Sequence, residues 1–178
     1  TMFFLTWFPT YLIEYRGLNF LETGFLGSIP FLAAFFGVLL SGFTSDFLVK
    51  KGFSAEISRK VPIIFGMLLS TIIIGGNYTS GTFFVILFLA LAFFGNGLAS
   101  IAWVFVSLLA PAKHLGLIGG TFNFIGGLSG VVVSIVIGFL VEDGDFRPAL
   151  FFVGAIALLG FLSYTFVVGK VERIEIKE

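Results

Sequence analysis

The sequence contains no cysteine, a single histidine and few charged residues. Only 11% of its 178 residues are charged, and ten basic residues balance ten acidic ones. Without cysteine, disulfide bonds, thiolate catalysis and cysteine-ligated zinc sites are excluded, and His114 alone provides too few ligands for another metal site. A formal net charge of zero provides no basic surface for nucleic acid. We therefore expect no metal, no cofactor and no nucleic-acid partner.

Motifs for catalysis are also missing. The chain has no Ser/His/Asp arrangement, no phosphate-binding loop of the Walker type and no pair of carboxylates in the middle of a hydrophobic segment. These absences argue against an intramembrane hydrolase and against an ATP-driven pump. We expect a protein that is not an enzyme, and any transport that it performs must draw its energy from a gradient.

Hydrophobic residues dominate what is present. They make up 58% of the chain and include 26 Phe, whereas soluble domains carry about 25% charged residues. A helix of roughly 20 apolar residues crosses the hydrocarbon core, and lipid leaves an open-ended chain no other backbone structure. We predict an all-α, polytopic membrane bundle over residues 1–169 and a charged tail at 170–178. The helices are expected near residues 2–15, 22–49, 61–76, 82–110, 115–141 and 148–168.

The first of these segments, 2–15, is too short to span a membrane and contains Pro9. We interpret it as the second half of a helix that starts before residue 1. The bundle is thus expected to have its first helix truncated.

The basic residues are distributed unevenly among the connectors. Only Arg16 and Arg147 fall on one side of the predicted bundle. The other side and the tail hold Lys50, Lys51, Arg59, Lys60, Lys113, Lys170, Arg173 and Lys177. Since loops rich in Lys and Arg stay in the cytoplasm, the loops near 50–60 and 113 and the C-terminus are predicted to be cytoplasmic.

Polar residues line one face of the predicted helix 82–110. Asn96, Ser100, Trp103 and Ser107 follow one another at helical spacing. An amide, two hydroxyls and an indole N–H on one face suit a polyhydroxylated solute. The alternative is that Gly95-Asn96-Gly97 is a helix-packing element and Trp103 a large core side chain, since buried Ser and Asn often bridge helices. Both interpretations remain open on these residues.

The predicted helix 115–141 carries a stripe of small residues with one amide, Asn123, among them. The stripe consists of Gly116, Gly120, Gly127, Gly130 and Ser134. Small residues let another backbone approach closely. The amide of Asn123 can hold a sugar hydroxyl or a carboxylate, or it can make an interhelical hydrogen bond instead.

A group of polar residues at the end of helix 22–49 predicts a conformational latch. Gly42 permits tight helix contact, and Asp46 can accept a hydrogen bond from a neighbouring helix N-terminus or from Arg59. Such a contact can be made or broken as a transporter changes conformation. The alternative is a solvated helix end without a latch.

Short motifs along all six segments resemble the C-terminal half of the major facilitator superfamily. The branch is the anion:cation symporter family of D-galactonate, glucarate and hexuronate transporters, and its D-galactonate members look most similar. The motifs are Thr6-Trp7-Phe8-Pro9-Thr10-Tyr11-Leu12, Pro30-Phe31-Leu32-Ala33-Ala34, Gly37-Val38-Leu39-Leu40-Ser41-Gly42, Ala92-Phe93-Phe94-Gly95-Asn96-Gly97, Ala110-Pro111 and Phe122-Asn123-Phe124.

The resemblance implies a six-helix half of an inner-membrane transporter that imports a sugar acid with protons by alternating access. It implies that Ser100, Trp103 and Asn123 face the substrate. It also implies that the charged residues for proton coupling and for the substrate carboxylate belong to an N-terminal half outside this sequence. The expected partners are therefore a sugar acid, protons, the bilayer and that other half.

Two other functions remain open on the sequence. One is a half-size facilitator or scaffold that dimerises through the small-residue stripe of helix 115–141. The other is an exporter of a different organic anion or of a drug, in which Trp103 and the many Phe side chains line an apolar cavity.

Overall fold

Helices are the only regular elements in the described part of the chain. The computed structural model describes residues 6–79, 81–141 and 143–169. Among these residues, five helical segments are long and apolar enough to cross a membrane, namely Phe20–Lys50, Ala55–Tyr78, Thr82–Leu109, Ala112–Leu140 and Arg147–Val167. The predicted all-α membrane bundle is confirmed. The predicted tail at 170–178 and the start of the first predicted helix lie outside the described residues.

The first helical stretch is short, and a glycine separates it from the next helix. It consists of α2 (Phe8–Thr10) and a π-helix, η1 (Tyr11–Tyr15). Gly17 follows with a φ of 69°, in the left-handed region that ends many helices. The next helix, α3 (Phe20–Lys50), begins with a capping box. In that box, the Glu22 N–H donates to Asn19 Oδ1 at 2.9 Å, and the Asn19 N–H donates to Glu22 Oε2 at 3.0 Å.

The third helix starts earlier than the sequence predicts. It comprises α4 (Ala55–Ser70) and the 3₁₀ segment η2 (Thr71–Tyr78), so it begins at residue 55 instead of 61. The prediction excluded the polar residues Glu56 to Lys60 because they lower the hydropathy. These residues form the first turns instead, since the Ser54 hydroxyl accepts the Ile57 N–H at 3.2 Å as an N-cap.

The fourth predicted span contains a break. It consists of α5 (Thr82–Ala99), the 3₁₀ turn η3 (Ser100–Ala102) and α6 (Trp103–Leu109). A second 3₁₀ turn, η4 (Ala112–His114), leads into α7 (Leu115–Leu140). The last helix is α8 (Arg147–Leu162), which continues into the π-helix η5 (Ser163–Val167).

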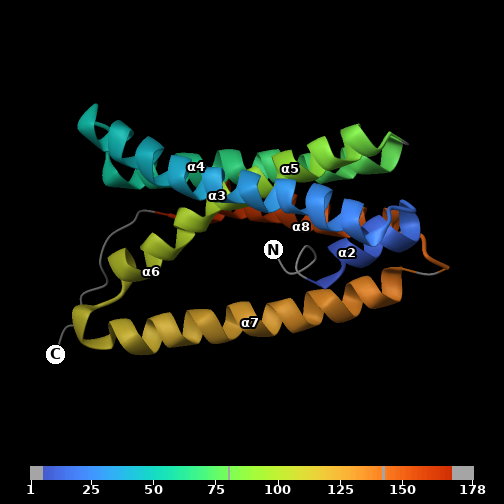
Figure 1. Ribbon diagram of the computed structural model, residues 1–178. Helices are drawn as coiled ribbons and strands as arrows, with labels where there is room; N and C mark the ends of the chain where they lie inside the picture. The colour runs from blue at the N-terminus through green and yellow to red at the C-terminus, as the bar shows by residue number, and fades with distance from the viewer. Residues whose placement is uncertain (1–5, 80, 142, 170–178) are drawn as a thin grey trace.

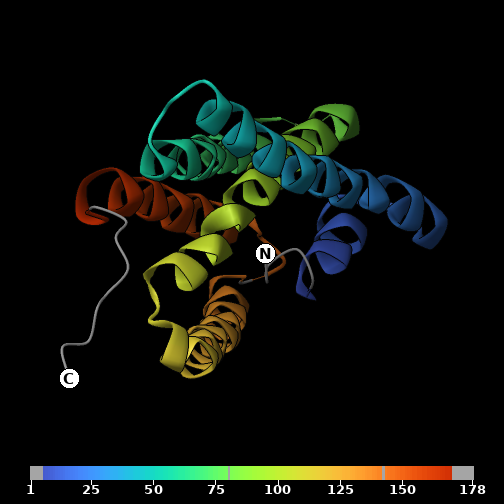
Figure 2. The same ribbon diagram turned by 90° about the vertical axis from the view of Figure 1, so that its left-hand side faces the viewer.

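The helices separate into a packed group and one outlying member. Figures 1 and 2 both show α3, α4, α5 and α8 lying together, while α7 lies apart and α6 slants across to reach it. Half of the apolar window of the α5–α6 span, 50%, is buried inside the chain, whereas the windows of α7 and α8 are each 11% buried. The main core is centred on the packed group, with Leu89, Phe93 and Leu150, and it also includes Phe8 of α2 and Ile137 of α7.

Glycines allow α5 to pack between α3 and α4. A Cβ added to Gly97 would overlap the carbonyl oxygen of Ala34 in α3. A Cβ added to Gly95 or to Gly66 would likewise overlap the carbonyl oxygen of the other glycine, which joins α5 to α4. The two glycines that flank Asn96 are therefore helix-packing residues, as the alternative interpretation of this motif holds.

Candidate functional site

Trp103 and Asn123 lie on two helices, α6 and α7, that contact each other. Trp103, at the start of α6, packs edge-on against Phe122 of α7, with the ring centroids 4.8 Å apart and the planes at 77°. Asn123 is the next residue on α7 and is exposed, and Trp103 is 48% exposed. An indole and an amide therefore lie on a surface that this chain leaves largely uncovered.

Asn96 and Ser100 belong to the same predicted span as Trp103 but are less exposed. The polar face predicted for this span is rotated between these two residues and Trp103. Both residues are half-buried. A 3₁₀ residue turns the chain by about 120° and an α-helical residue by about 100°. The three residues of η3 thus rotate α6 by roughly 60° relative to a continuous helix. Asn96 already takes part in a contact within the protein. Trp103 is therefore more accessible to a ligand than Asn96.

Much of the small-residue stripe of α7 is open in the described structure, although Gly130 is buried. A Cβ placed on Gly116, Gly120 or Gly127 would meet nothing within 4 Å in the described structure. The reason is that α7 lies apart from the packed helices. A hydrogen bond of 3.2 Å from Trp7 Nε1, just before α2, to the carbonyl oxygen of Ser134 joins α7 to the first helical stretch, and Ile137 of α7 reaches the main core.

The predicted latch is not formed in this structure. Asp46 is exposed and lines a groove of about 500 Å³ at the end of α3. Arg59 is half-buried, and its Nη1 atom is buried without a hydrogen-bond partner. Among the described residues, no ion pair joins Asp46 to Arg59. A Cβ on Gly42 would also meet nothing within 4 Å, so the expected tight contact is absent in this conformation.

Lys60, which the sequence analysis did not single out, holds two helix ends together. Its Nζ donates to Glu56 Oε1 at 2.6 Å and to the carbonyl oxygens of Val168 at 2.8 Å and Gly169 at 2.6 Å. A cation there satisfies carbonyl groups at the end of the last helix. The spacing of Glu56 and Lys60 by four residues was a signal for the ion pair, but nothing in the sequence indicated the contact with residues 168 and 169.

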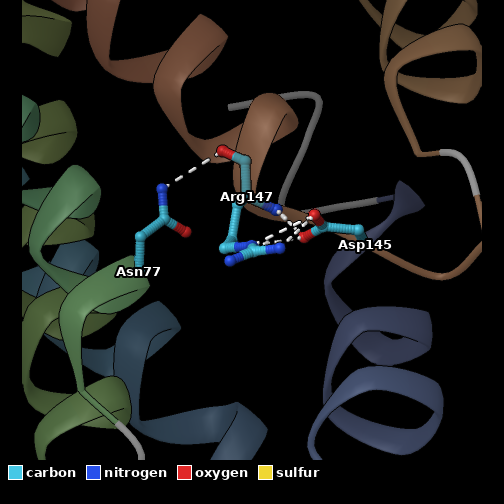
Figure 3. Close-up of polar contacts among 3 residues, drawn as sticks. All are labelled: Asn77, Asp145 and Arg147. Atoms are coloured by element: carbon cyan, nitrogen blue, oxygen red, sulfur yellow. Dashed lines mark hydrogen bonds and ion pairs between the residues drawn. The ribbon is translucent and has the colours of Figure 1, made fainter.

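A second polar cluster, also missed, lies at the end of the bundle that holds the connectors near 79 and 145. Figure 3 shows the Asn77 amide directed at the carbonyl of Arg147, with Nδ2 to O at 3.1 Å. The Arg147 guanidinium faces Asp145, with Nη2 to Oδ2 at 2.8 Å. Hydrogen bonds from the Arg147 side chain and backbone hold the pKa of Asp145 below its usual range.

No metal site is found in the part of the chain that the structure describes. His114, the single histidine, lies half-buried in η4 at the start of α7.

The spans and their sparse polar groups define a multi-pass membrane protein. Residues 1–177 match the Major Facilitator Superfamily, and the chain belongs to this family. It is 54% identical over 172 residues to a D-galactonate transporter of Escherichia coli, covering 97% of this chain and 40% of the relative. It is also 46% identical over 179 residues to a probable galactarate/D-glucarate transporter of Bacillus subtilis, covering 100% and 39%.

A more distant relative has the same coverage. A hexuronate transporter of Bacillus subtilis is 30% identical over 166 residues, covering 90% of this chain and 39% of the relative. The chain thus spans about two fifths of the length of these relatives, from 39% to 40%. The predicted resemblance to the superfamily and to sugar-acid transporters is confirmed.

Proposed function

We propose that this chain is the C-terminal half of a secondary transporter that carries a sugar acid, with protons, across the inner membrane by alternating access. The observation that supports this most strongly is the similarity of nearly the whole chain to proteins named as transporters of galactonate, galactarate or glucarate, and hexuronate. The five membrane-length helices agree with such a role. The proposed orientation places the loops near 50–60 and 113 and the C-terminus in the cytoplasm, because those regions hold most of the basic residues.

We assign substrate contacts to neutral groups. The indole of Trp103 and the amide of Asn123 are exposed on neighbouring helices, and Ser100 and Asn96 lie deeper along the same span. Neutral donors and acceptors suit a polyhydroxylated anion because they bind its hydroxyls without the desolvation cost of a buried charge. The indole N–H of Trp103 and the amide of Asn123 would be the main groups that bind the sugar hydroxyls.

The charges of the mechanism are proposed to come from the other half. The acidic residues of the described spans, Glu22, Asp46 and Glu56, lie in the first or last turns of their helices. A carboxylate at the bilayer midplane is the usual proton relay in transporters. Proton coupling and the pairing of the substrate carboxylate are therefore assigned to the N-terminal half. Gly42, Asp46 and Arg59 are proposed to form a latch that closes in another conformation.

Uptake into proteoliposomes tests this proposal. The full-length transporter that contains this chain should accumulate radiolabelled D-galactonate, and an inward proton gradient should increase the rate. Asn123→Ala should lower uptake at limiting substrate by about tenfold, the loss expected for one well-placed hydrogen bond to a charged solute. Ser107→Ala is the matched control, because its hydroxyl is bonded to the carbonyl of Val104 at 2.8 Å.

Several outcomes contradict the proposal in distinct ways. Absence of uptake, or uptake that ignores the proton gradient, contradicts the function or its coupling. Equal losses for Asn123→Ala and Ser107→Ala contradict the site. Uptake by this chain alone would favour the half-size facilitator, and preferential transport of an apolar drug would favour the exporter.

A further inference from the structure

The side chain of Arg16 forms a three-way bridge at one end of the bundle. Its Nη2 donates to the carbonyl oxygen of Gly76 at 2.7 Å, and its Nη1 donates to that of Thr79 at 3.0 Å. Its Nε donates to the hydroxyl of Tyr11 at 2.8 Å. Gly76 and Thr79 lie at the end of η2, where carbonyl groups lack partners within the helix. The guanidinium therefore joins the first helix to the turn between α4 and α5.

Two tyrosine rings hold the guanidinium in place. The Cζ atom of Arg16 lies 5.4 Å from the ring centroid of Tyr11 and 5.2 Å from that of Tyr15. Those rings stack on each other at 5.6 Å. Phe146, fully buried between α7 and α8, packs edge-on against Tyr11 at 5.4 Å. Stacking on aromatic faces while bridging two carbonyls is a property of arginine that lysine cannot reproduce.

The turn that Arg16 binds is also tied to the last helix. Asn77, between the two carbonyls, donates to the carbonyl oxygen of Arg147 at the start of α8. Arg147 in turn binds Asp145 through its side chain (Figure 3). The first helix, the α4–α5 turn and the α7–α8 connector thus meet through side chains at one end of the bundle.

The helix that carries Arg16 ends in a π-helical turn. The Arg16 N–H donates to the carbonyl oxygen of Tyr11 at 3.1 Å, which closes the π-helical turn η1. π-Helical turns are rare and frequently occur at functional sites. Conversion of η1 to an α-helix would shift the register by one residue and turn Arg16 by roughly 100° about the helix axis. That rotation would withdraw the guanidinium from both carbonyls.

The two ends of the bundle differ in how they are fastened. At the Arg16 end, three segments are joined by hydrogen bonds to a single side chain and its neighbours. At the end near residue 50, Lys60 ties the start of α4 to the carbonyl oxygens of Val168 and Gly169, but Asp46 and Arg59 make no ion pair with each other. Alternating access requires one end to be closed while the other is open.

We propose that Arg16, seated on Tyr11 and Tyr15, is a clasp that closes this end of the bundle when it binds the carbonyls of Gly76 and Thr79. Release of the clasp, through rearrangement of η1, lets the first helix move away from the α4–α5 turn. The clasp proposal depends on the proposed transport function in one respect only. Transport by alternating access is the reason why this end of the bundle must open. The closure itself can be measured without any substrate.

The distance across the clasp tests the proposal directly. Glu14 and Tyr78 are both exposed. These 178 residues contain no cysteine, so spin labels attach only at Glu14→Cys and Tyr78→Cys once any cysteine in the rest of the full-length protein has been replaced. The measurement is a double electron–electron resonance distance distribution on the full-length protein in lipid nanodiscs. With Arg16 present, a short distance should dominate. Arg16→Gln should add a longer distance and raise the ratio of open to closed protein about tenfold or more, as expected when a charged donor loses its hydrogen bonds.

Arg147→Gln is the matched control. It removes an arginine side chain from the same end of the bundle, but this guanidinium is 61% exposed and binds Asp145 rather than the α4–α5 turn. The distance distribution should therefore stay unchanged. Arg16→Lys keeps the charge but lacks the planar guanidinium that stacks on both tyrosine rings, and it should give an intermediate open fraction.

The outcomes separate the clasp from the transport function. An unchanged distribution in Arg16→Gln overturns the clasp even if galactonate is transported. If Arg16→Gln does not fold, Arg16→Lys decides, and an unchanged distribution in that variant overturns the clasp as well. A longer distance in the Arg16 variants supports the clasp even if the substrate proves to be another solute.

Discussion

α7 carries seven glycines among its 26 residues and α5 only two among its 18, yet it is the two on α5 that other helices enclose most tightly. Gly95 and Gly97 of α5 touch the backbones of α4 and α3 so closely that no Cβ fits. Gly116, Gly120 and Gly127 of α7 have open space on the described structure. The comparison shows that a small-residue stripe indicates a capacity for close helix contact. It does not indicate whether the partner belongs to the same chain.

The difference assigns distinct roles to the two helices. α5 is the centre of the packed group, and the Ser70 hydroxyl of α4 adds a hydrogen bond to the carbonyl of Ala92 at 3.0 Å. α7 has an uncovered small-residue face that also carries Asn123. In the proposed transporter, that face is available to the other half, whereas α5 has its partners within this chain.

The largest effect is expected from filling the close contact on α5. Gly97→Ala places a methyl group against the Ala34 carbonyl and should destabilise the bundle by about 3 kcal/mol, the upper part of the range for overpacking. Gly120→Ala, the matched substitution on α7, should be neutral or stabilising by up to about 1 kcal/mol, because Ala favours helix. Thermal unfolding in detergent, followed by circular dichroism, measures both variants. Equal losses of stability in Gly97→Ala and Gly120→Ala would contradict the distinction between the enclosed glycines of α5 and the open glycines of α7.

A smaller effect is expected from loosening α7. Trp7→Phe removes the indole donor to the Ser134 carbonyl, a neutral hydrogen bond worth about 1 kcal/mol. Amide hydrogen exchange should become faster in α7 and remain unchanged in α5, because α7 has few other attachments. Faster exchange in both helices would show that α7 is not an independently held element and would weaken the distinction.

The smallest effect concerns the connector that joins α7 to the packed group. Arg147 lowers the pKa of Asp145 from its ordinary value of 3.8. Because the folded-state pKa is the lower one, the ion pair stabilises the connector above pH 3.8, and this contribution is lost as the pH falls through the lowered pKa. The Asp145 side chain is 35% exposed and that of its partner Arg147 is 61% exposed, so water screens the ion pair and the change should be slight.

A pH series on Asp145→Asn measures this contribution. The variant should unfold at a slightly lower temperature than the unmodified chain at neutral pH, and the difference should vanish under acid conditions. A difference that persists in acid would mean that the carboxylate charge is not its cause.

Local sequence signals predicted most helices because each rests on short-range physics. The span 22–49 was predicted from hydropathy. In the structure this helix begins at residue 20, after the Asn19 and Glu22 capping box, a local signal that the prediction did not use. The same reasoning misplaced the start of α4, because Glu56 and Lys60 were taken as loop residues although they form an ion pair one turn apart. It also treated residues 82–110 as one helix, because a 3₁₀ turn such as η3 leaves no clear mark in hydropathy.

The candidate site was predicted less completely than the helices. Trp103 and Asn123 were selected from helical spacing, and the structure places their helices in contact through Phe122. Arg16 was assigned only to a connector, because its partners are backbone carbonyls 60 and 63 residues away and carry no residue-specific signal. The Asp46 and Arg59 pair was predicted from charge, but charge alone does not specify which conformation forms it.

The sequence by itself determined that this protein is a bundle of membrane-spanning helices, because apolar segments of this length in lipid must satisfy their own backbone hydrogen bonds. It also determined the superfamily, through motifs spread along the whole chain. Only the tertiary structure decided which glycines other helices enclose, which carbonyl groups Arg16 binds and which helix lies apart. Those properties depend on contacts between residues far apart in the sequence, where one backbone or carbonyl looks the same as any other.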